Sequence, residues 1–341
     1  LIGTAGSTDV PPAVRAIFAK PLYQGSLWGL RVMDARTGQV LINLRPDHDF
    51  YIGSVRKIFS VGGLMNEVGA QHRSVTPIYR HGRIDSEGVL DGDLILVASG
   101  DLTMGGRTRR DGSIAVSNFD HNEADSLGNA VLTAPDPLRG YIRLARQVAA
   151  SGVRRIKGDV VIDDRLWVPF DFRGEFDVRP IFVNDDCVDL IIHPAKTATE
   201  TNRPPASVNW RPVSAALNVR STLVMSAPHS QANIDLDPQF PQCIGTRGCT
   251  ARIAGQLPAD FQPPFTNAFP LIRTFRIVEP ANYARTALIE ALKAAGVAVD
   301  ADPVARNPVR LLPPKNSYPA GSKVASLVSA TNAQHAKLIL K

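Results

Sequence analysis

Phe50-Tyr51-Ile52-Gly53-Ser54-Val55-Arg56-Lys57 is the most informative segment of this chain. It contains the only S-x-x-K tetrad in the sequence, from Ser54 to Lys57. Apolar residues recur after it at helical spacing, which predicts a helix that opens at Ser54 and ends at Gly69: Ile58, Val61, Met65 and Val68. A Ser at the start of a helix and a Lys three residues later lie on one face, one turn apart.

This placement of a hydroxyl and an amine suits acyl transfer. Unpaired N–H groups and a partial positive charge favour negative charge at a helix N-terminus. Ser54 is therefore the candidate acyl nucleophile, and Lys57 is the candidate general base that takes its proton. The alternative is that Ser54 is only an N-cap and Lys57 a solvated residue of the first turn, because a short motif needs structural context.

Composition indicates an ordinary globular protein with two or three domains. The chain has 341 residues, of which 44% are hydrophobic and 21% charged. It has no run of about 18 apolar residues, so we expect no integral membrane segment. The net charge of +6 would suit an anionic wall polymer, a membrane surface or nucleic acid. The arginines are scattered without interleaved aromatic residues, which argues against nucleic acid.

Two of the three cysteines are close enough in the sequence to form a disulfide in an oxidising compartment. Cys243 and Cys249 enclose a short glycine-containing span that could close as a disulfide. The alternative is a pair of reduced surface thiols. We expect Cys187 to be a buried small hydrophobic residue.

No cofactor and no metal are expected. The cysteines lack the partners that would complete four zinc ligands. Acidic runs at residues 47–49, 163–164 and 184–186 are predicted to be solvated or strand-end turns. The glycine-rich run at residues 100–106 lacks the G-K-[ST] of a phosphate loop.

Periodicity and turn residues predict a mixture of helices and strands. We expect strands at 27–33 and 40–44, further strands over 75–99 with turns at 85–88 and 91–93, and a strand at 158–163. Residues 103–137 are predicted to be a loop or irregular surface, and residues 170–270 a β-rich region. Helices are predicted at 14–20, 138–151, 280–295 and 324–340.

Several blocks, in the right order over most of the chain, resemble the penicillin-binding D-Ala-D-Ala carboxypeptidase/endopeptidase family (peptidase family S13, class C low-molecular-weight penicillin-binding proteins). They are residues 29–34, 37–38, 50–57, 88–94, 98–103, 151–153, 156–159, 162–163 and 283–297. Their joint occurrence is more specific than the tetrad alone.

The resemblance implies an α+β fold, in which a β-lactamase/transpeptidase-like catalytic domain is interrupted by a large β-rich insertion. Residues 1–74 and 320–341 would form the catalytic domain, incomplete at its C-terminal side. Residues 75–319 would form the insertion, as two subdomains.

Two further motifs of the family are not found. The family also needs S-x-N and K-T-G. Lys196-Thr197-Ala198 is interpreted as a loop that only superficially matches K-T-G, and Ser329-Ala330-Thr331-Asn332 is not S-x-N. We therefore expect this chain to be one piece of a longer protein, nicked or truncated after Lys341, with a C-terminal fragment of the same protein as a partner.

By resemblance, Ser54 would attack a D-Ala-D-Ala peptide bond of peptidoglycan with Lys57 as base, and β-lactams would acylate the same serine. The protein would be periplasmic or otherwise extracytoplasmic, secreted through a removed signal peptide. β-Lactamases and related esterases share the tetrad, but the large insertion favours the carboxypeptidase. From a different class, a non-catalytic cell-wall-binding or scaffold protein could retain the fold without a complete site.

Overall fold

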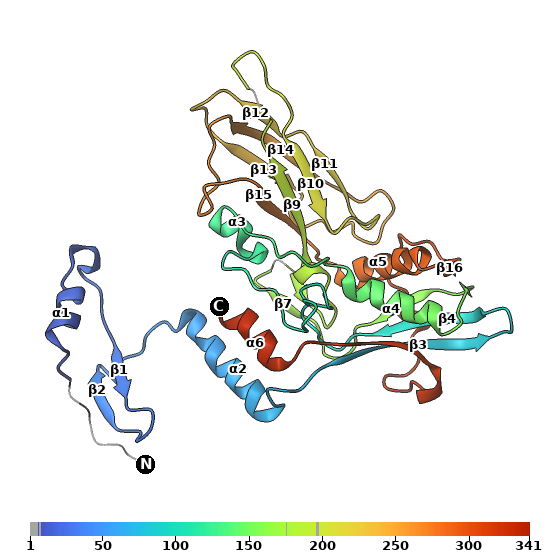
Figure 1. Cartoon of the computed structure of the whole chain (residues 1–341), viewed down its shortest axis with the longest axis horizontal. Coiled ribbons are helices and arrows are strands. Elements are labelled where there is room, and N and C mark those ends of the chain that lie inside the picture. Colours follow the sequence, from blue (N-terminus) through green and yellow to red (C-terminus); the bar gives the residue numbers. More distant parts are fainter. Residues whose placement is uncertain (1–5, 7, 175, 196–197) are drawn as a thin grey trace. The chain divides into compact units, whose positions relative to one another are not determined.

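The computed structural model describes residue 6 and residues 8–174, 176–195 and 198–341. It divides into two compact units, Leu1–Ser60 and Val61–Lys341 (Figure 1). In the smaller unit, α1 (Pro12–Phe18) and the short helix η1 (Pro21–Tyr23) precede a β-hairpin. Strands β1 (Leu30–Met33) and β2 (Val40–Leu44) pair antiparallel, as predicted. Asp34 closes their turn, since its carboxylate accepts from the N–H groups of Arg36 and Thr37, each at 2.8 Å.

The larger unit is organised around a six-stranded mixed sheet. Its strand order is β16-β5-β4-β3-β17, with β6 also paired to β4. Strands β3 and β4 form a long antiparallel hairpin, β17 pairs antiparallel with β3, and β5 and β6 run parallel to β4. The strand bounds are Val75–Ile84 for β3, Val89–Val97 for β4, Arg155–Ile156 for β5, Val160–Asp163 for β6, Ala298–Val299 for β16 and Lys323–Val328 for β17.

Two helices lie side by side on this sheet, α4 (Arg139–Ala150) and α5 (Pro280–Ala294). On α4 the buried residues Tyr141, Leu144 and Val148 recur at helical spacing, as an amphipathic helix requires. Most of α5 is buried, and its fully enclosed Arg285 donates to the Asp159 carboxylate at 2.6 and 2.9 Å. Both helices end before a glycine with positive φ, as predicted.

The β-rich region predicted for 170–270 is confirmed. Strands β9 (Cys187–His193), β10 (Ser207–Arg211) and β15 (Leu271–Arg276) form one antiparallel sheet. A second sheet has the order β11-β14-β12, with β13 also paired to β14. Its strands are β11 (Asn218–Ser221), β12 (Val224–Ser226), β13 (Asn233–Asp237) and β14 (Thr250–Pro258), and a small hairpin joins β7 (Phe170–Phe172) to β8 (Phe176–Val178). Of the two alternatives for Cys243 and Cys249, the structure has the disulfide. Cys187 is free and buried, as expected.

The helix predicted over 324–340 is wrong in its first half. Residues Lys323–Val328 form strand β17, and only Asn332–Leu340 form a helix, α6. Ala325 and Leu327 are buried at alternate positions, so this part follows the period of a strand paired with β3. Thr331 caps α6, because its hydroxyl accepts from the N–H of Gln334.

Two further predictions are corrected. Residues 91–93 are no turn but lie inside β4, because Gly92 pairs with Gly82 across the hairpin. Residues 103–137 are mostly irregular, with only η3 (His121–Glu123) and the short α3 (Ala124–Leu127), but they are not simply surface. Met104, Ile114 and His121 within them are buried. A polarity pattern without period cannot show that a loop is buried.

The close approach of β3 and β4 at Gly82 and Gly92 generates a testable expectation. A Cβ built on Gly92 would lie 2.1 Å from the His81 carbonyl oxygen, and φ at Gly92 is 145°. We expect Gly92→Ala to lower the free energy of unfolding by about 1–3 kcal/mol, measured by chemical denaturation. Gly62→Ala in α2 is the matched control, because nothing lies within 4 Å of that position. An equal effect of both substitutions would contradict this view of the hairpin.

Candidate functional site

Ser54 lies at the entrance of helix α2 (Arg56–Glu67), within the short 3-10 helix η2 (Gly53–Val55) that precedes it. Gly53 has φ of 52°, which turns the chain into the helix at a conformation that glycine adopts readily. The side chain of Ser54 is exposed. Its backbone N–H has no acceptor among the described residues, whereas its carbonyl accepts from the N–H of Arg56.

Lys57 stands in the first turn of α2 and is half-buried. In the described part of the chain, neither the Lys57 amine nor the Ser54 hydroxyl takes part in a hydrogen bond or ion pair, with each other or with another group. The hydroxyl of Ser60, one turn on, contacts the carbonyl oxygens of Arg56 and Lys57 at 3.3 Å each. The structure thus places the two predicted site residues on one turn, with both functional groups uncommitted.

Large apolar side chains remain exposed around these two residues. Ile58 is 62% exposed and Phe59 is 69% exposed, and of the predicted apolar positions on α2 only Val61 is fully buried. A helix that is apolar on more than one side is typical of a buried helix rather than a surface one.

The other motif positions have structural roles or fall outside the described residues. Lys196 and Thr197 lie outside them. Ser329 lies just before α6; its hydroxyl accepts from the N–H of Ser74 at 2.9 Å and donates to the Ala330 carbonyl at 2.7 Å. This serine therefore ties the end of β17 to the start of β3.

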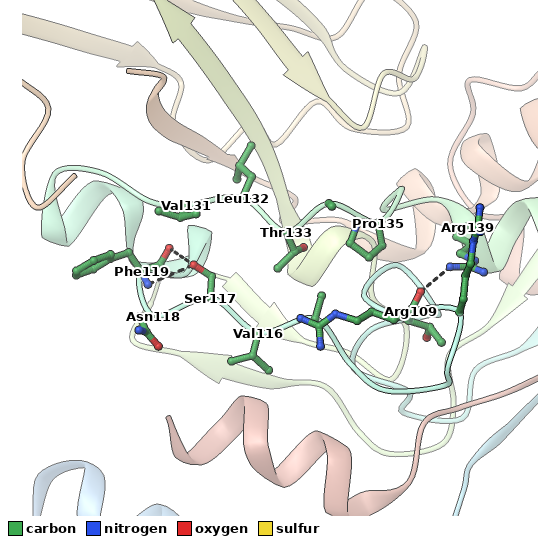
Figure 2. Close-up of a pocket in the computed structure, with 14 residues that line it drawn as sticks. Arg109, Val116, Ser117, Asn118, Phe119, Val131, Leu132, Thr133, Pro135 and Arg139 are labelled. Atoms are coloured by element: carbon green, nitrogen blue, oxygen red, sulfur yellow. Dashed lines mark hydrogen bonds between the residues drawn. The ribbon is translucent and has the colours of Figure 1, made fainter. Parts of the chain in front are cut away.

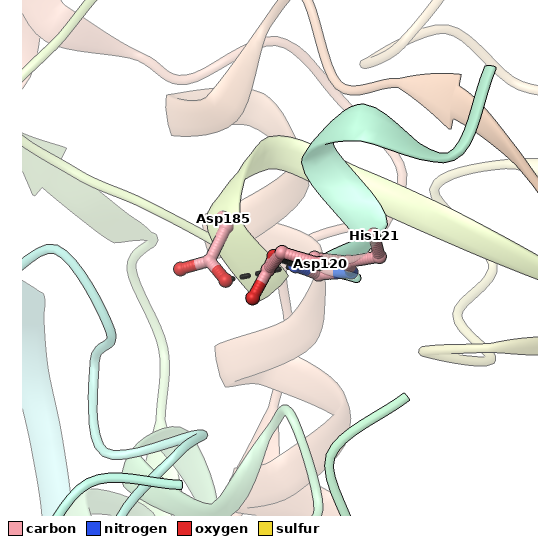
Figure 3. Close-up of side chains that lie close together, drawn as sticks. All are labelled: Asp120, His121 and Asp185. Atoms are coloured by element: carbon pink, nitrogen blue, oxygen red, sulfur yellow. Dashed lines mark hydrogen bonds and ion pairs between the residues drawn. The ribbon is translucent and has the colours of Figure 1, made fainter. Parts of the chain in front are cut away.

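A buried network of charges, which the sequence interpretation missed, lies in the larger unit. Arg107 donates to both oxygens of Asp120 at 2.7 and 2.8 Å, and to Asp185 at 2.6 Å. His121 contacts Asp185 at 2.8 Å through Nε2 and Asp189 at 2.6 Å through Nδ1 (Figure 3 shows Asp120, His121 and Asp185). The network links the irregular segment 103–137 to β9.

Backbone strain accompanies this network. Asn184, Asp185 and Asp186 have φ of 51°, 52° and 58°, an uncommon conformation that Asn and Asp tolerate better than most residues. The carboxylate of Asp185 meets Arg107 and His121 from this turn. The residues 184–186 were predicted to be a strand-end turn; they do precede β9, but Asp185 is paired in the interior rather than solvated.

Asp120, His121 and Asp185 offer ligand atoms within 4.8 Å of one another, close enough for a metal ion. Their present partners make an ion-pair network the better explanation. Arg107 is hydrogen-bonded to both carboxylates, and both ring nitrogens of His121 face carboxylates. An imidazole that donates from both nitrogens has no lone pair for a metal.

The neighbouring charges shift the pKa values of His121 and Asp120 in the directions that keep both groups charged. Burial by itself lowers the pKa of His121, but the negative charges of Asp189 and Asp185 and their hydrogen bonds raise it to about 9. For the carboxyl group of Asp120, burial acts in the opposite direction and raises the pKa. The hydrogen bonds and the charge of Arg107 outweigh burial, so the pKa of Asp120 is lowered. His121 is thus a cation at neutral pH.

The acidic pair at 163–164 is also engaged in ion pairs. Asp163 ends β6 and binds Arg165 at 2.7 Å and the Tyr318 hydroxyl at 2.6 Å. Asp164 pairs with Arg179 at 3.2 Å. The predicted position at a strand end is confirmed, but both aspartates are buried and paired rather than solvated.

The family model and the curated relative that match this chain both belong to D-Ala-D-Ala carboxypeptidases. The model of the D-Ala-D-Ala carboxypeptidase 3 (S13) family matches residues 11–341. A D-alanyl-D-alanine carboxypeptidase from Actinomadura sp. (strain R39) is 23% identical over 352 residues, which cover 98% of this chain and 57% of that protein. The family resemblance seen in the sequence is therefore confirmed.

Solved structures show the same fold. Penicillin binding protein 4 (dacB) from Haemophilus influenzae matches with a TM-score of 0.55 at 15% identity, over 89% of this chain and 56% of that chain. The same protein complexed with a novel beta-lactam (CMV) matches with a TM-score of 0.53 at 16% identity, over 91% of this chain and 56% of that chain. The chain spans little more than half the length of the relatives it matches.

The first expectation from this site concerns Arg107. Arg107→Met should remove the cation that Asp120 and Asp185 share, leaving Lys341 for Asp120 and His121 for Asp185, and should lower the free energy of unfolding by about 3 kcal/mol, the lower end for breaking a buried ion pair. Arg83→Met on β3 is the control, because that arginine is exposed. A loss under 1 kcal/mol in urea denaturation at pH 7 would show that the network contributes little to stability.

The second expectation concerns pH. The pKa of His121 is raised to about 9 in the folded protein, from an ordinary value of 6.5. The stabilisation that its charge provides is therefore complete below about pH 6.5 and disappears as the pH rises through about 9. Urea denaturation from pH 6 to 10 should show a loss of stability in this window that is reduced in His121→Gln. Parallel pH profiles of the two proteins would refute the assigned charge of His121.

Proposed function

The chain belongs to the D-Ala-D-Ala carboxypeptidase 3 (S13) family, and from this membership we propose that it carries the nucleophile of a serine D-Ala-D-Ala carboxypeptidase/endopeptidase acting on peptidoglycan peptides. The observation that carries the proposal is the entrance of α2, where the Ser54 hydroxyl in η2 and the Lys57 amine in the first turn of α2 have no competing partner among the described residues. β-Lactams would acylate the same serine.

In the proposed mechanism, Ser54 attacks the carbonyl carbon of the peptide bond between two D-Ala residues while Lys57 takes the hydroxyl proton. The tetrahedral intermediate would gain a hydrogen bond to its oxyanion from the backbone N–H of Ser54, which has no other acceptor in the described part of the chain. Its collapse breaks the C–N bond, and the leaving amine receives a proton. Water then hydrolyses the acyl-enzyme and releases the shortened peptide.

We further propose that residues 1–74 and 320–341 belong to the transpeptidase-like catalytic domain and that 75–319 form its insertion. Support comes from hydrogen bonds between the two outer segments. The side chain of Asn332 donates to the Gly69 carbonyl at 3.0 Å, and the Ala333 N–H donates to the Ala70 carbonyl at 2.9 Å. The exposed apolar side chains of α2 also fit a helix that packs inside such a domain.

An extracytoplasmic location is part of the proposal. The disulfide between Cys243 and Cys249 supports it, because disulfides persist in oxidising compartments. Among the described residues, no helix has the length and apolar character needed to traverse a bilayer.

The proposal predicts a covalent adduct on Ser54. Incubation with benzylpenicillin should add the mass of one β-lactam, and peptide mapping by mass spectrometry should place it on Ser54. Ser54→Ala should lose the adduct completely, because the attacking oxygen is removed. Lys57→Met should slow adduct formation by about 10²–10⁴-fold, the range that a general base contributes.

Ser60→Ala is the matched control, since Ser60 lies in α2 only six residues after Ser54 and is also exposed. It should be labelled like the unaltered protein. An adduct that persists in Ser54→Ala would refute the assignment. No adduct on the protein that contains this chain would favour the alternative, a non-catalytic cell-wall-binding or scaffold protein.

A further inference from the structure

A cleft of about 920 Å³ opens in the larger unit between residues 115–119 and 131–135 (Figure 2). Its lining contains three arginines and no acidic residue. The remaining wall is largely apolar: Ala115, Val116, Phe119, Val131, Leu132, Ala134 and Pro135. A cleft of this size and composition suits a ligand that has both apolar parts and negative charge.

The three arginines keep hydrogen-bonding capacity for such a ligand. Arg139 donates to the Thr108 carbonyl at 2.6 Å, and Arg109 donates to the Ile114 carbonyl at 3.1 Å. Arg110 is exposed and its side chain has no partner among the described residues. Each guanidinium carries five N–H donors, so most of them remain available. Within the described ranges, none of the three lies in an ion pair at 4.0 Å or less.

Two carboxylates lie next to the lining along the chain. Asp111 follows Arg110; it accepts from the N–H of Ser113 at 2.9 Å and from its hydroxyl at 2.7 Å, and it also interacts electrostatically with Arg109. Asp136 follows Pro135 and accepts from the Leu138 N–H at 2.8 Å. Three arginines beside two carboxylates leave an excess of positive charge at the cleft.

Backbone groups along both walls are also unpaired. The Val131 N–H donates to the Phe119 carbonyl at 2.7 Å and closes the cleft at one end. In the described part of the chain, the N–H groups of Val116, Leu132 and Thr133 have no hydrogen-bond acceptor. Unpaired main-chain donors on facing segments are what an added extended peptide uses for binding.

The walls are held in place before any ligand arrives. The Ala115 N–H donates to the Arg107 carbonyl at 2.8 Å, and Arg107 in turn binds Asp120, which follows the first wall. On the second wall, Arg211 donates to the Thr133 carbonyl at 2.7 Å. A preformed cleft lowers the entropy cost of binding.

We propose that this cleft binds an extended peptide that carries at least one carboxylate. The arginines would form charge-assisted hydrogen bonds with the carboxylate, the backbone of the walls would pair with the peptide backbone, and the apolar wall would contact its side chains. A simple polyanion would use the arginines but neither the apolar wall nor the unpaired N–H groups. The inference goes beyond acyl transfer and does not depend on Ser54.

The test is isothermal titration calorimetry of the whole protein with acetyl-Ala-Glu-Ala-Glu-Ala-amide. The neutral peptide acetyl-Ala-Gln-Ala-Gln-Ala-amide should bind at least about tenfold more weakly, since hydrogen bonds to charged groups provide that much discrimination. Arg110→Glu should weaken binding of the acidic peptide by a similar factor. Arg220→Glu is the matched control, because Arg220 is exposed on β11 and the change in net charge is the same.

Binding by the unaltered protein, lost in Arg110→Glu and kept in Arg220→Glu, would support the proposal. No measurable binding of the acidic peptide, or equal weakening by both substitutions, would overturn it. Inorganic polyphosphate that binds as tightly, with the same dependence on Arg110, would show a general anion site and would also overturn it. Ser54→Ala should bind the acidic peptide as the unaltered protein does. A negative result in the calorimetry would therefore not bear on the β-lactam labelling of Ser54, and a negative labelling result would not bear on the cleft.

Discussion

Arg107 is enclosed in the larger unit, with its side chain 5% exposed, and its guanidinium joins Asp120 of the irregular segment to Asp185 of the turn before β9. The remainder of the network depends on this contact. Asp185 also holds His121, and His121 holds Asp189, which in turn binds Arg211 of β10 at 3.0 Å. Segment 103–137 has almost no regular secondary structure, so these charges and a few buried apolar residues determine its position. Removing Arg107 would leave Asp120 and Asp185 each with one cationic partner fewer, which is costly for a buried carboxylate.

The sheet supplies the frame around this network. β3 and β17 are far apart in the sequence, but Val75–Tyr79 pairs with Lys323–Val328, which brings the segment that follows α2 beside the segment that leads into α6. The Asn332 and Ala333 hydrogen bonds to Gly69 and Ala70 extend this proximity beyond the sheet. Val75 at the start of β3 lies opposite Val328 at the end of β17, so the proposed insertion would begin beside the chain segment to which it returns.

Two features of different character therefore lie on one chain. Ser54 in η2 and Lys57 in the first turn of α2 are the proposed reactive pair, and the chain belongs to the D-Ala-D-Ala carboxypeptidase 3 (S13) family. The cleft beside 115–119 is basic and has unpaired backbone donors, and its walls rest on the same ion network that fixes the irregular segment. Binding at the cleft and chemistry at the serine can be examined one without the other, since they share no residue.

Local patterns in the amino-acid sequence were enough to predict several elements and the family. Turn residues and periodicity located the β1–β2 hairpin, α2, α4 and α5, and the S-x-x-K tetrad with its surrounding blocks pointed to the family. The first half of the predicted helix 324–340 was wrong because a short apolar run fits a helix and a strand alike, and pairing with the distant strand β3 makes Lys323–Val328 a strand. The ion network and the cleft could not be predicted in this way, because both depend on contacts between segments that are distant in the sequence. His121 meets partners 64 and 68 residues away, and Arg107 meets one 78 residues away. Such contacts have no period and no fixed spacing, because they arise when the fold brings distant segments together and excludes water from between them.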